Sequence, residues 1–283
     1  MLRVAIQKSG RLSEDSLQLI KNCGISYPKM KARLKTEAYN FPMELLYLRD
    51  DDIPQYVADG VADIGIVGEN ELLEKDKEVE VIEHLGFSKC RLSIAVPRDM
   101  NFQSIEQLNG LSIATSYPVI LKNFLRDKGL KCQIHEISGS VEIAPSIGLA
   151  GAICDLVSTG STLLSNGLKE VAVVMKSEAV LVANPNLSEE KKALMDKLLF
   201  RIQTVNRAKQ YKYVLLNAPN SRLTDIINIL PGMKSPTVLP LAVEGWSSVH
   251  SVVKEKAFWE IIDELRDMGA EGILIVPIEK MIL

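Results

Sequence analysis

Extended apolar runs and helix-like runs alternate through the first 180 residues, and this alternation restricts the fold more than any other feature. Strand candidates lie at residues 2–7, 43–48, 62–67, 79–84, 90–96, 111–115, 132–137, 153–157, 171–175 and 179–182. Helical spacing lies between them, at residues 13–22, 51–58, 104–108, 118–128 and 142–149. The alternation predicts an α/β architecture with mainly parallel sheets. Ligands of such sheets bind beyond the carboxyl ends of the strands, so the loops there are the candidate sites.

The pattern changes near residue 188. Residues 188–209 have the spacing of one long amphipathic helix, with an apolar stripe at Leu194, Leu198, Ile202 and Val205. Strand-like and helix-like segments then follow in the order βαββαβ, at residues 211–216, 223–230, 237–242, 247–253, 257–268 and 272–277. This is the split-βαβ, ferredoxin-like pattern, and about 75 residues hold all of it. We therefore expect a separate C-terminal domain.

The composition is that of an ordinary globular protein and argues against several classes. Of the 283 residues, 47% are hydrophobic and 24% are charged, and the length suits about two domains. A net charge of −3 argues against a nucleic-acid partner bound on a basic face. No apolar run approaches the roughly 18 residues of a membrane span, and the apolar start is too short for a signal peptide. We expect a cytoplasmic protein with no nucleic-acid or membrane partner.

Cysteine and histidine do not form ligand patterns. The cysteines are scattered in or near apolar segments, which is typical of reduced, buried thiols rather than of a disulfide framework (Cys23, Cys90, Cys132 and Cys154). The three histidines are isolated and lack the spacing of metal ligands (His84, His135 and His250). We expect neither a zinc site nor a Ser-His-Asp or Cys-His catalytic set.

The corner at 154–168, C-D-L-V-S-T-G-S-T-L-L-S-N-G-L, is rich in small hydroxyl residues. A strand ends and a helix begins here, so one interpretation is a capped turn. A cap needs one hydroxyl, however, and this corner supplies four, from Ser158, Thr159, Ser161 and Thr162. The second interpretation is a phosphate cradle, in which Gly160 lets the backbone approach closely and Asp155 accepts bonds from sugar hydroxyls. The residues alone leave both interpretations open.

Three further loops follow strands of this pattern. Q-K-S-G-R at 7–11 places Lys8 and Arg11 around a glycine, although such a basic pair is most often a solvated loop. Residues 62–70 add Asp63 and Glu69, which are equally well explained as structural acids, and S-Y-P at 116–118 opens a helix. A basic loop together with a hydroxyl-rich loop favours a pocket for a doubly phosphorylated ligand.

Segments around these loops resemble the long form of the ATP phosphoribosyltransferase family. The match runs in order through nearly the whole chain: A-I-Q-K-S-G-R-L (5–12), D-D-D-I-P (50–54), D-I-G-I-V-G-E-N (63–70), C-R-L-S-I-A (90–95), I-A-T-S-Y-P (113–118), G-S-V-E-I-A-P (139–145), I-C-D-L-V-S-T-G-S-T-L (153–163), N-G-L-K-E-V (166–171), L-P-G-M-K-S-P-T (230–237), F-W-E (258–260) and P-I-E-K-M (277–281). One position departs from the family, which usually has an acid before Ala152 where this chain has Gly151. If that acid supports the phosphate loop, its absence would lower activity.

The resemblance implies a catalytic region of two α/β lobes, similar to the core of a type II periplasmic binding protein. Lobe I would hold residues 1–92 with 178–205, and lobe II would hold residues 93–177. Residues 211–283 would form the regulatory, histidine-binding domain. Histidine would inhibit by shifting a homo-oligomer from a dimer towards a closed hexamer.

The family reaction, the first step of histidine biosynthesis, joins N1 of ATP to C1 of phosphoribosyl pyrophosphate and releases pyrophosphate. ATP supplies the nucleophile, so the protein has to supply position and charge compensation. The resemblance also implies Mg²⁺, held mainly by substrate oxygens with few protein ligands.

The resemblance assigns roles to individual residues. Residues 158–162 would hold the 5′-phosphate, and Asp155 would bind the ribose hydroxyls and take part in catalysis. Lys8 and Arg11 would face the triphosphate or pyrophosphate across the cleft.

The resemblance gives three further residues a role in substrate binding. For the two acids among them, a purely structural role is the alternative. Glu69 and Tyr117 would contact ATP. Glu142 would orient substrate, although a carboxylate at a helix start is often only a dipole partner.

For regulation, the resemblance indicates Asn217 and Gly272 together with Met233, Ser235 and Thr237 in the loop at 230–237. That loop is also an ordinary turn between a helix and a strand, and the residues alone favour the turn.

Two other functions stay open at this point. A solute-binding or sensor protein with the same core would bind ligand without turnover, but the lack of a signal peptide and the hydroxyl-rich loop argue against it. A silent regulatory subunit is the second, and the intact D-L-V-S-T-G-S-T segment argues against that.

Overall fold

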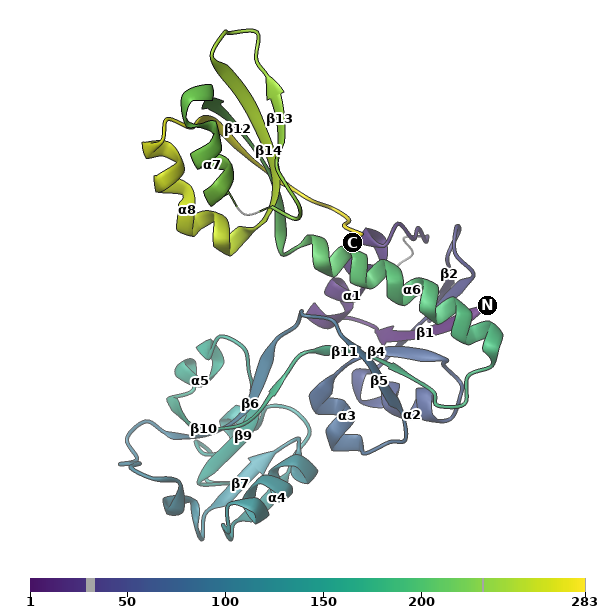
Figure 1. Ribbon diagram of the computed structural model, residues 1–283. Coiled ribbons are helices and arrows are strands. Elements are labelled where there is room, and N and C mark those ends of the chain that lie inside the picture. The colour runs from purple at the N-terminus through teal and green to yellow at the C-terminus, as the bar shows by residue number, and fades with distance from the viewer. Residues whose placement is uncertain (29–33, 231, 283) are drawn as a thin grey trace. The chain divides into compact units, whose positions relative to one another are not determined.

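A computed structural model describes residues 1–28, 34–230 and 232–282 of the chain (Figure 1). The chain divides into two compact units, Met1–Asp196 and Lys197–Leu283. The boundary falls inside the long helix α6 (Glu189–Ala208). Among the described residues, no helix has the length and apolarity to cross a bilayer.

The first sheet of the N-terminal unit has the strand order β2-β3-β1-β4-β11-β5. Its strands are β1 (Leu2–Gln7), β2 (Lys35–Glu37), β3 (Met43–Leu48), β4 (Ile64–Gly68), β5 (Glu80–His84) and β11 (Ala179–Ala183). The strand β1 lies parallel to β3 and β4, as the buried apolar run of its sequence predicts. The helices of this part are α1 (Arg11–Asn22), α2 (Ile53–Ala58) and α3 (Glu69–Lys75), with a 3₁₀ turn at Asp50–Asp52.

The second sheet of this unit has the order β10-β6-β9-β7-β8. Its strands are β6 (Cys90–Pro97), β7 (Ser112–Thr115), β8 (Gln133–Glu136), β9 (Ala152–Val157) and β10 (Leu168–Ser177). They are accompanied by α4 (Pro118–Asp127), α5 (Ser161–Ser165) and 3₁₀ turns at Ile105–Leu108 and Val141–Ile143. The carboxyl end of β9 leads directly into the corner that the sequence singled out.

The expectation of mainly parallel sheets is wrong. The strand β6 is antiparallel to β9 and β10, and β11 is antiparallel to β4 and β5. The chain passes from one sheet to the other twice, from β5 to β6 and from β10 to β11, and neither link holds a helix. The strands β6 and β11 therefore enter their sheets from the other sheet rather than by a helical crossover from a strand of the same sheet.

The C-terminal unit confirms the ferredoxin-like prediction. Its sheet has the order β13-β14-β12-β15, with every pairing antiparallel. The helices α7 (Leu223–Ile229) and α8 (Glu255–Asp267) lie together on one face of that sheet (Figure 1). Apolar residues of both helices form one core with the strands, including Ile226, Phe258 and Leu265. The strands are β12 (Tyr211–Pro219), β13 (Thr237–Pro240), β14 (Trp246–Lys254) and β15 (Glu271–Pro277).

One predicted helix is wrong, and one strand and one α-helix were not predicted. Residues 142–149 form only the end of a 3₁₀ turn, because Pro145 interrupts the helical hydrogen bonds and Gly148 has a positive φ of 74°. The unpredicted elements are the three-residue edge strand β2 and the helix α3, which carries few apolar residues. The bounds predicted for the lobes and the C-terminal domain stay predictions.

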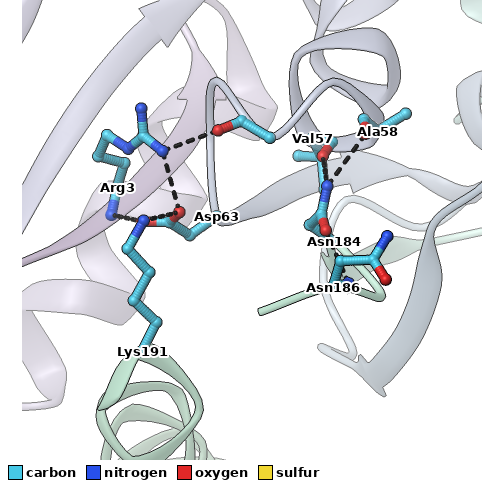
Figure 2. Close-up of polar contacts among 8 residues, drawn as sticks. Arg3, Val57, Ala58, Asp63, Asn184, Asn186 and Lys191 are labelled. Carbon is cyan, nitrogen blue, oxygen red and sulfur yellow. Dashed lines mark hydrogen bonds and ion pairs between the residues drawn. The ribbon is translucent and has the colours of Figure 1, made fainter. Parts of the chain in front are cut away.

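Asp63 is a structural acid, which resolves the alternative left open by the sequence. Its side chain is 3% exposed and accepts bonds from the Arg3 backbone N–H at 2.7 Å and the Lys191 ammonium at 2.7 Å (Figure 2). The Arg3 guanidinium adds a bond at 3.2 Å. Burial by itself would raise the pKa of Asp63, but the bonds from Lys191 and Arg3 outweigh it and hold that pKa below its ordinary value. Asp63 therefore ties the first turn of α6, at Lys191, to the first sheet.

Candidate active site

The corner after β9 presents free backbone donors around a left-handed glycine. Gly160 has φ 84° and ψ 0°, a conformation that glycine adopts without steric cost. Within the described parts of the chain, the N–H groups of Thr159, Gly160 and Thr162 have no hydrogen-bond partner. The hydroxyls of Thr159 and Ser161 lie 3.1 Å apart, and the Thr159 hydroxyl accepts a long bond of 3.5 Å from the Ser161 N–H at the start of the five-residue helix α5. Side-chain capping of this helix start is therefore weak, and the three free N–H groups favour an anion.

A cavity of about 230 Å³ brings the predicted phosphate-binding residues together. Its polar lining consists of Glu142, Asp155, Ser158, Thr159, Gly160 and Thr162. Ser161 is absent from the lining and is instead paired with Thr159. The structure therefore places five of the six predicted phosphate-loop residues in one lining, with Ser161 beside it, and their binding role stays a prediction.

Asp155 is a half-buried acid whose charge is poorly compensated. The Leu156 N–H donates to its Oδ1 at 2.8 Å, and among the described residues no cation pairs with it. Burial raises the pKa of Asp155, and the neighbouring Glu142 carboxylate raises it further, while the Leu156 bond acts in the opposite direction. An acid held in this way can accept hydrogen bonds from a neutral polyol such as a ribose.

Arg11 connects the basic loop to the hydroxyl-rich loop. It is the first residue of α1, and its guanidinium donates to the Ser158 hydroxyl at 3.3 Å, with Asp15 at 3.8 Å as a second partner. Lys8 is exposed directly after β1, and its backbone N–H donates to the Leu48 carbonyl. Arg11 thus contacts the hydroxyl-rich loop, whereas the Lys8 side chain has no protein partner in the described residues.

Tyr117 lies in a buried polar network that the sequence did not indicate. Its hydroxyl donates to the Glu71 carboxylate at 2.8 Å, and the Asn70 amide donates to the same carboxylate at 3.1 Å. Ser177 donates to the Asn70 oxygen at 2.8 Å. Glu71 and Tyr117 are each 8% exposed, and burial raises the pKa of both. An ATP contact in which the Tyr117 hydroxyl is the donor would have to replace its bond to Glu71.

The same network joins the parts of the unit that carry the two sheets. Glu71 and Asn70 lie at the start of α3, while Tyr117 precedes α4. Glu74 of α3 accepts bonds from the N–H groups of Val119 and Ile120 in the first turn of α4. The first N–H groups of α4, which have no partner within their own helix, are thus capped by the Glu74 carboxylate of α3.

Tyr117→Phe is expected to lower the free energy of unfolding by about 1–3 kcal/mol, because it removes one donor from a buried carboxylate. Chemical denaturation of the full chain measures this. Tyr39→Phe is the matched control, since Tyr39 is 72% exposed and should shift stability by less than about 0.5 kcal/mol. Equal effects of the two changes would contradict the importance of the network.

Glu69 is placed beside a second cavity. This cavity of about 560 Å³ is lined by charged residues from both sheets, among them Glu69, Lys89, Arg91 and Lys176, and it also contacts Ser158. Glu69 is half-buried, and its backbone N–H donates to the Glu178 carbonyl. Glu69 therefore lines the same cavity as Ser158, the first residue of the hydroxyl-rich loop.

Gly151 lies at the other end of β9 from the cradle. Six strand residues separate it from Ser158, a distance of about 20 Å. The expectation that an acid here supports the phosphate loop therefore finds no structural basis. A Cβ at Gly151 would meet the Leu111 side chain at 3.5 Å and the Ser112 carbonyl at 3.8 Å, which are ordinary contacts.

Gly151→Asp is expected to change turnover by less than about twofold and stability by less than about 0.5 kcal/mol, as for a surface substitution outside any special feature. Steady-state rates of the two proteins measure this. A large gain of activity in the variant would show that the missing acid matters over this distance.

The predicted regulatory residues do not meet at one point of the C-terminal unit. Asn217 on β12 and Gly272 on β15 lie together, since a Cβ on Gly272 would meet the Asn217 amide at 3.1 Å. Thr237 lies on the opposite edge strand β13, paired with His250 of β14. Met233 and Ser235 are exposed in the loop before β13.

The cysteines and two of the histidines take structural positions. Cys23 and Cys154 are buried, Cys90 and Cys132 are half-buried, and all are free thiols. His84 contacts Glu178 at 3.2 Å, and His250 lies between the hydroxyls of Tyr213 and Ser248, each at 3.0 Å. The described residues hold no group of three His, Cys, Asp or Glu side chains that could bind a metal ion.

Comparisons with known families cover nearly the whole chain. The profile of a family described as ATP phosphoribosyltransferase matches residues 49–204, and one described as HisG, C-terminal domain, matches residues 208–280. An ATP phosphoribosyltransferase of Cytophaga hutchinsonii is 62% identical over 282 residues, covering 100% of this chain and 99% of the relative. One of Bacteroides thetaiotaomicron is 58% identical over 283 residues, covering 100% of both chains.

Solved structures agree with the two-sheet architecture of the N-terminal unit. An ATP phosphoribosyl transferase (HisG:HisZ) complex from Thermotoga maritima has a TM-score of 0.63 at 29% identity, covering 73% of this chain and 98% of that chain. A periplasmic sulfonate-binding protein, SsuA from Methylobacillus flagellatus, has a TM-score of 0.51 at 14% identity, covering 74% and 69%. The second likeness concerns the fold alone. Together they confirm the expected two-lobe core similar to a periplasmic binding protein.

Proposed function

The chain belongs to the ATP phosphoribosyltransferase family, and from this premise we propose that it transfers the phosphoribosyl group of phosphoribosyl pyrophosphate to N1 of ATP. Pyrophosphate is the leaving group, and phosphoribosyl-ATP is the product. This reaction would be the first step of histidine biosynthesis, carried out in the cytoplasm.

The free donors of the corner after β9 are the observation that carries the proposal. The N–H groups of Thr159, Gly160 and Thr162 have no protein partner among the described residues, and these three residues line one cavity. We assign them to the 5′-phosphate, together with the Ser158 and Thr159 hydroxyls. Asp155, in the same lining, is assigned to the ribose hydroxyls, because a carboxylate repels phosphate but accepts bonds from hydroxyls.

The chemistry requires no protein nucleophile. The sugar C1 becomes cationic as the bond to pyrophosphate breaks, and N1 of ATP then forms the new bond to C1. The protein holds the two substrates in line and stabilises the charge that develops. Asp155 and Glu142 line the same cavity, and their negative charge would favour the cationic sugar.

Arg11 and Lys8 are assigned to the pyrophosphate or to the triphosphate of ATP. Arg11 already reaches the Ser158 hydroxyl, so it lies beside the proposed 5′-phosphate site. Glu69 near the adjoining cavity is assigned to the ATP side of the site. The described residues offer no metal-binding cluster, so Mg²⁺ is proposed to arrive on substrate oxygens, where it would neutralise pyrophosphate charge.

The C-terminal unit is proposed to bind histidine as a feedback inhibitor. Asn217 and Gly272, which lie together, are the part of the predicted set that could contact one ligand within a single chain. Thr237 on the other edge would then act through a second copy of the chain, in line with a dimer that shifts to a hexamer.

The test is the rise in absorbance of phosphoribosyl-ATP when the protein is mixed with ATP, phosphoribosyl pyrophosphate and Mg²⁺, with pyrophosphatase present to remove the leaving group. Product that depends on both substrates is expected, and histidine is expected to suppress it. Binding of phosphoribosyl pyrophosphate without product would favour the silent subunit or the sensor. If histidine leaves the formation of product unchanged, only the assignment of histidine as a feedback inhibitor is contradicted.

A further inference from the structure

One arginine beside the cradle has no role in the proposed function. Arg91 is the second residue of β6, and its backbone pairs with Val157, the last residue of β9. Its side chain therefore starts directly beside the point where the chain enters the hydroxyl-rich loop. The segment C-R-L-S-I-A, in which it lies, has no assigned role.

Each nitrogen of the Arg91 guanidinium donates one hydrogen bond, and the three bonds go to two different residues. Nε and Nη2 donate to the two oxygens of Glu170 at 2.6 and 2.5 Å, which is the bidentate arrangement. The buried Ser93 hydroxyl donates to the same carboxylate at 2.8 Å and so holds it in place. The remaining nitrogen, Nη1, donates to the Ser158 main-chain carbonyl at 3.2 Å.

The bond to the Ser158 carbonyl determines where the next N–H group points. The peptide between Ser158 and Thr159 is planar and trans, so its carbonyl and its N–H point in opposite directions. Holding the carbonyl on Arg91 therefore holds the Thr159 N–H away from Arg91. A donor on the carbonyl also polarises the peptide and strengthens its N–H as a donor.

We propose that Arg91, clamped by Glu170 and Ser93, is a positioning residue that aims the Thr159 N–H into the cradle and so sets the affinity for phosphoribosyl pyrophosphate. The inference rests on the proposed function, since it takes the cradle to be the 5′-phosphate site. The Arg11 bond to the Ser158 hydroxyl then holds the same residue from the other loop. The alternative is that Arg91 and Glu170 only cross-link β6 and β10, which would affect stability alone.

Arg91→Lys tests the inference because lysine keeps the charge and cannot hold Glu170 with two nitrogens and the carbonyl with a third. We expect the KM for phosphoribosyl pyrophosphate to rise about tenfold, with the KM for ATP unchanged within about twofold. Glu170→Gln should do the same, and the double variant should lose no more than the worse single variant. Arg126→Lys is the control, since the Arg126 side chain is 73% exposed and, among the described residues, pairs only with Asp127.

Equilibrium binding of phosphoribosyl pyrophosphate and thermal unfolding are measured on the same proteins. A normal affinity in both Arg91→Lys and Glu170→Gln, with only a lower unfolding temperature, would overturn the inference in favour of the cross-link. Failure of the wild-type protein to bind phosphoribosyl pyrophosphate would instead overturn the proposed function, and this inference with it. A selective loss of affinity in the variants supports the positioning role.

Discussion

Gly160→Val is expected to abolish useful binding of phosphoribosyl pyrophosphate and to lower kcat/KM by about 100- to 1,000-fold, comparable to losing an anion-stabilising donor group. Gly160 has φ 84°, where a β-branched residue is a steric outlier. Space does not limit the change, because a Cβ would approach only the Val157 side chain, at 4.0 Å. The valine therefore acts by turning the backbone, so that the N–H groups of the cradle no longer converge.

A second glycine of the same corner provides the control. Gly167 has φ 69°, follows the other end of α5, and leaves open space within 4 Å of the position that a Cβ would take. Gly167→Val thus carries the same backbone strain, of about 1–2 kcal/mol, outside the cradle. Isothermal titration with phosphoribosyl pyrophosphate is expected to separate the two variants. Equal affinities would contradict the role of Gly160.

Asp155→Asn and Asp63→Asn are expected to change stability in opposite directions. Asp155 is half-buried without a cation among the described residues, and burial raises its pKa, so its charge costs stability at neutral pH. An isosteric amide keeps the acceptor for the Leu156 N–H and removes that cost. We expect the variant to gain about 1 kcal/mol while activity falls roughly 10- to 100-fold, because the charged acceptor for the ribose is lost.

Asp63→Asn is expected to lose about 2–3 kcal/mol of stability. The change leaves Arg3 and Lys191 without their shared carboxylate, and the loss is smaller than for a fully buried pair because their side chains stay 35% and 30% exposed. Activity per folded molecule should stay near that of the wild type, since Asp63 lies outside both cavities described beside the cradle.

The two acids also differ in the pH range where their contributions change. The pKa of Asp63 is lowered, so its stabilisation is complete above the ordinary carboxyl value of 3.8 and is lost as the pH falls through the lower folded value. The pKa of Asp155 is raised, so its destabilisation is absent at low pH and develops as the pH rises towards the raised value. Urea unfolding at several pH values measures both. Parallel curves for the two variants would contradict the assignment of one acid to structure and the other to substrate.

Local patterns were sufficient for most of the fold. The buried run at Leu2–Gln7, the order of elements after Tyr211 and the corner after β9 each depend on neighbouring residues, so the sequence indicates them directly. The direction of β6 and β11 depends on which sheet a strand joins. No periodicity encodes that choice, because the strand that precedes each of them in the chain lies in the other sheet.

The candidate site likewise has one part that the sequence indicates and another that only the folded structure shows. The hydroxyls and Gly160 lie within five residues and could be found from the sequence. Arg91 is 67 residues from Ser158, and Tyr117 is 46 residues from Glu71, so their hydrogen bonds exist only once the chain has folded. A resemblance to a family identifies the segments that contain these residues. Only the structure shows which group each side chain contacts.

A crystal structure of the protein with phosphoribosyl pyrophosphate bound would show directly which group of the ligand occupies the cradle. We expect the 5′-phosphate to accept hydrogen bonds from the N–H groups of Thr159, Gly160 and Thr162, with the ribose hydroxyls on Asp155 and the pyrophosphate towards Arg11. A reversed ligand, with pyrophosphate in the cradle and the 5′-phosphate beside Lys8 and Arg11, would contradict it.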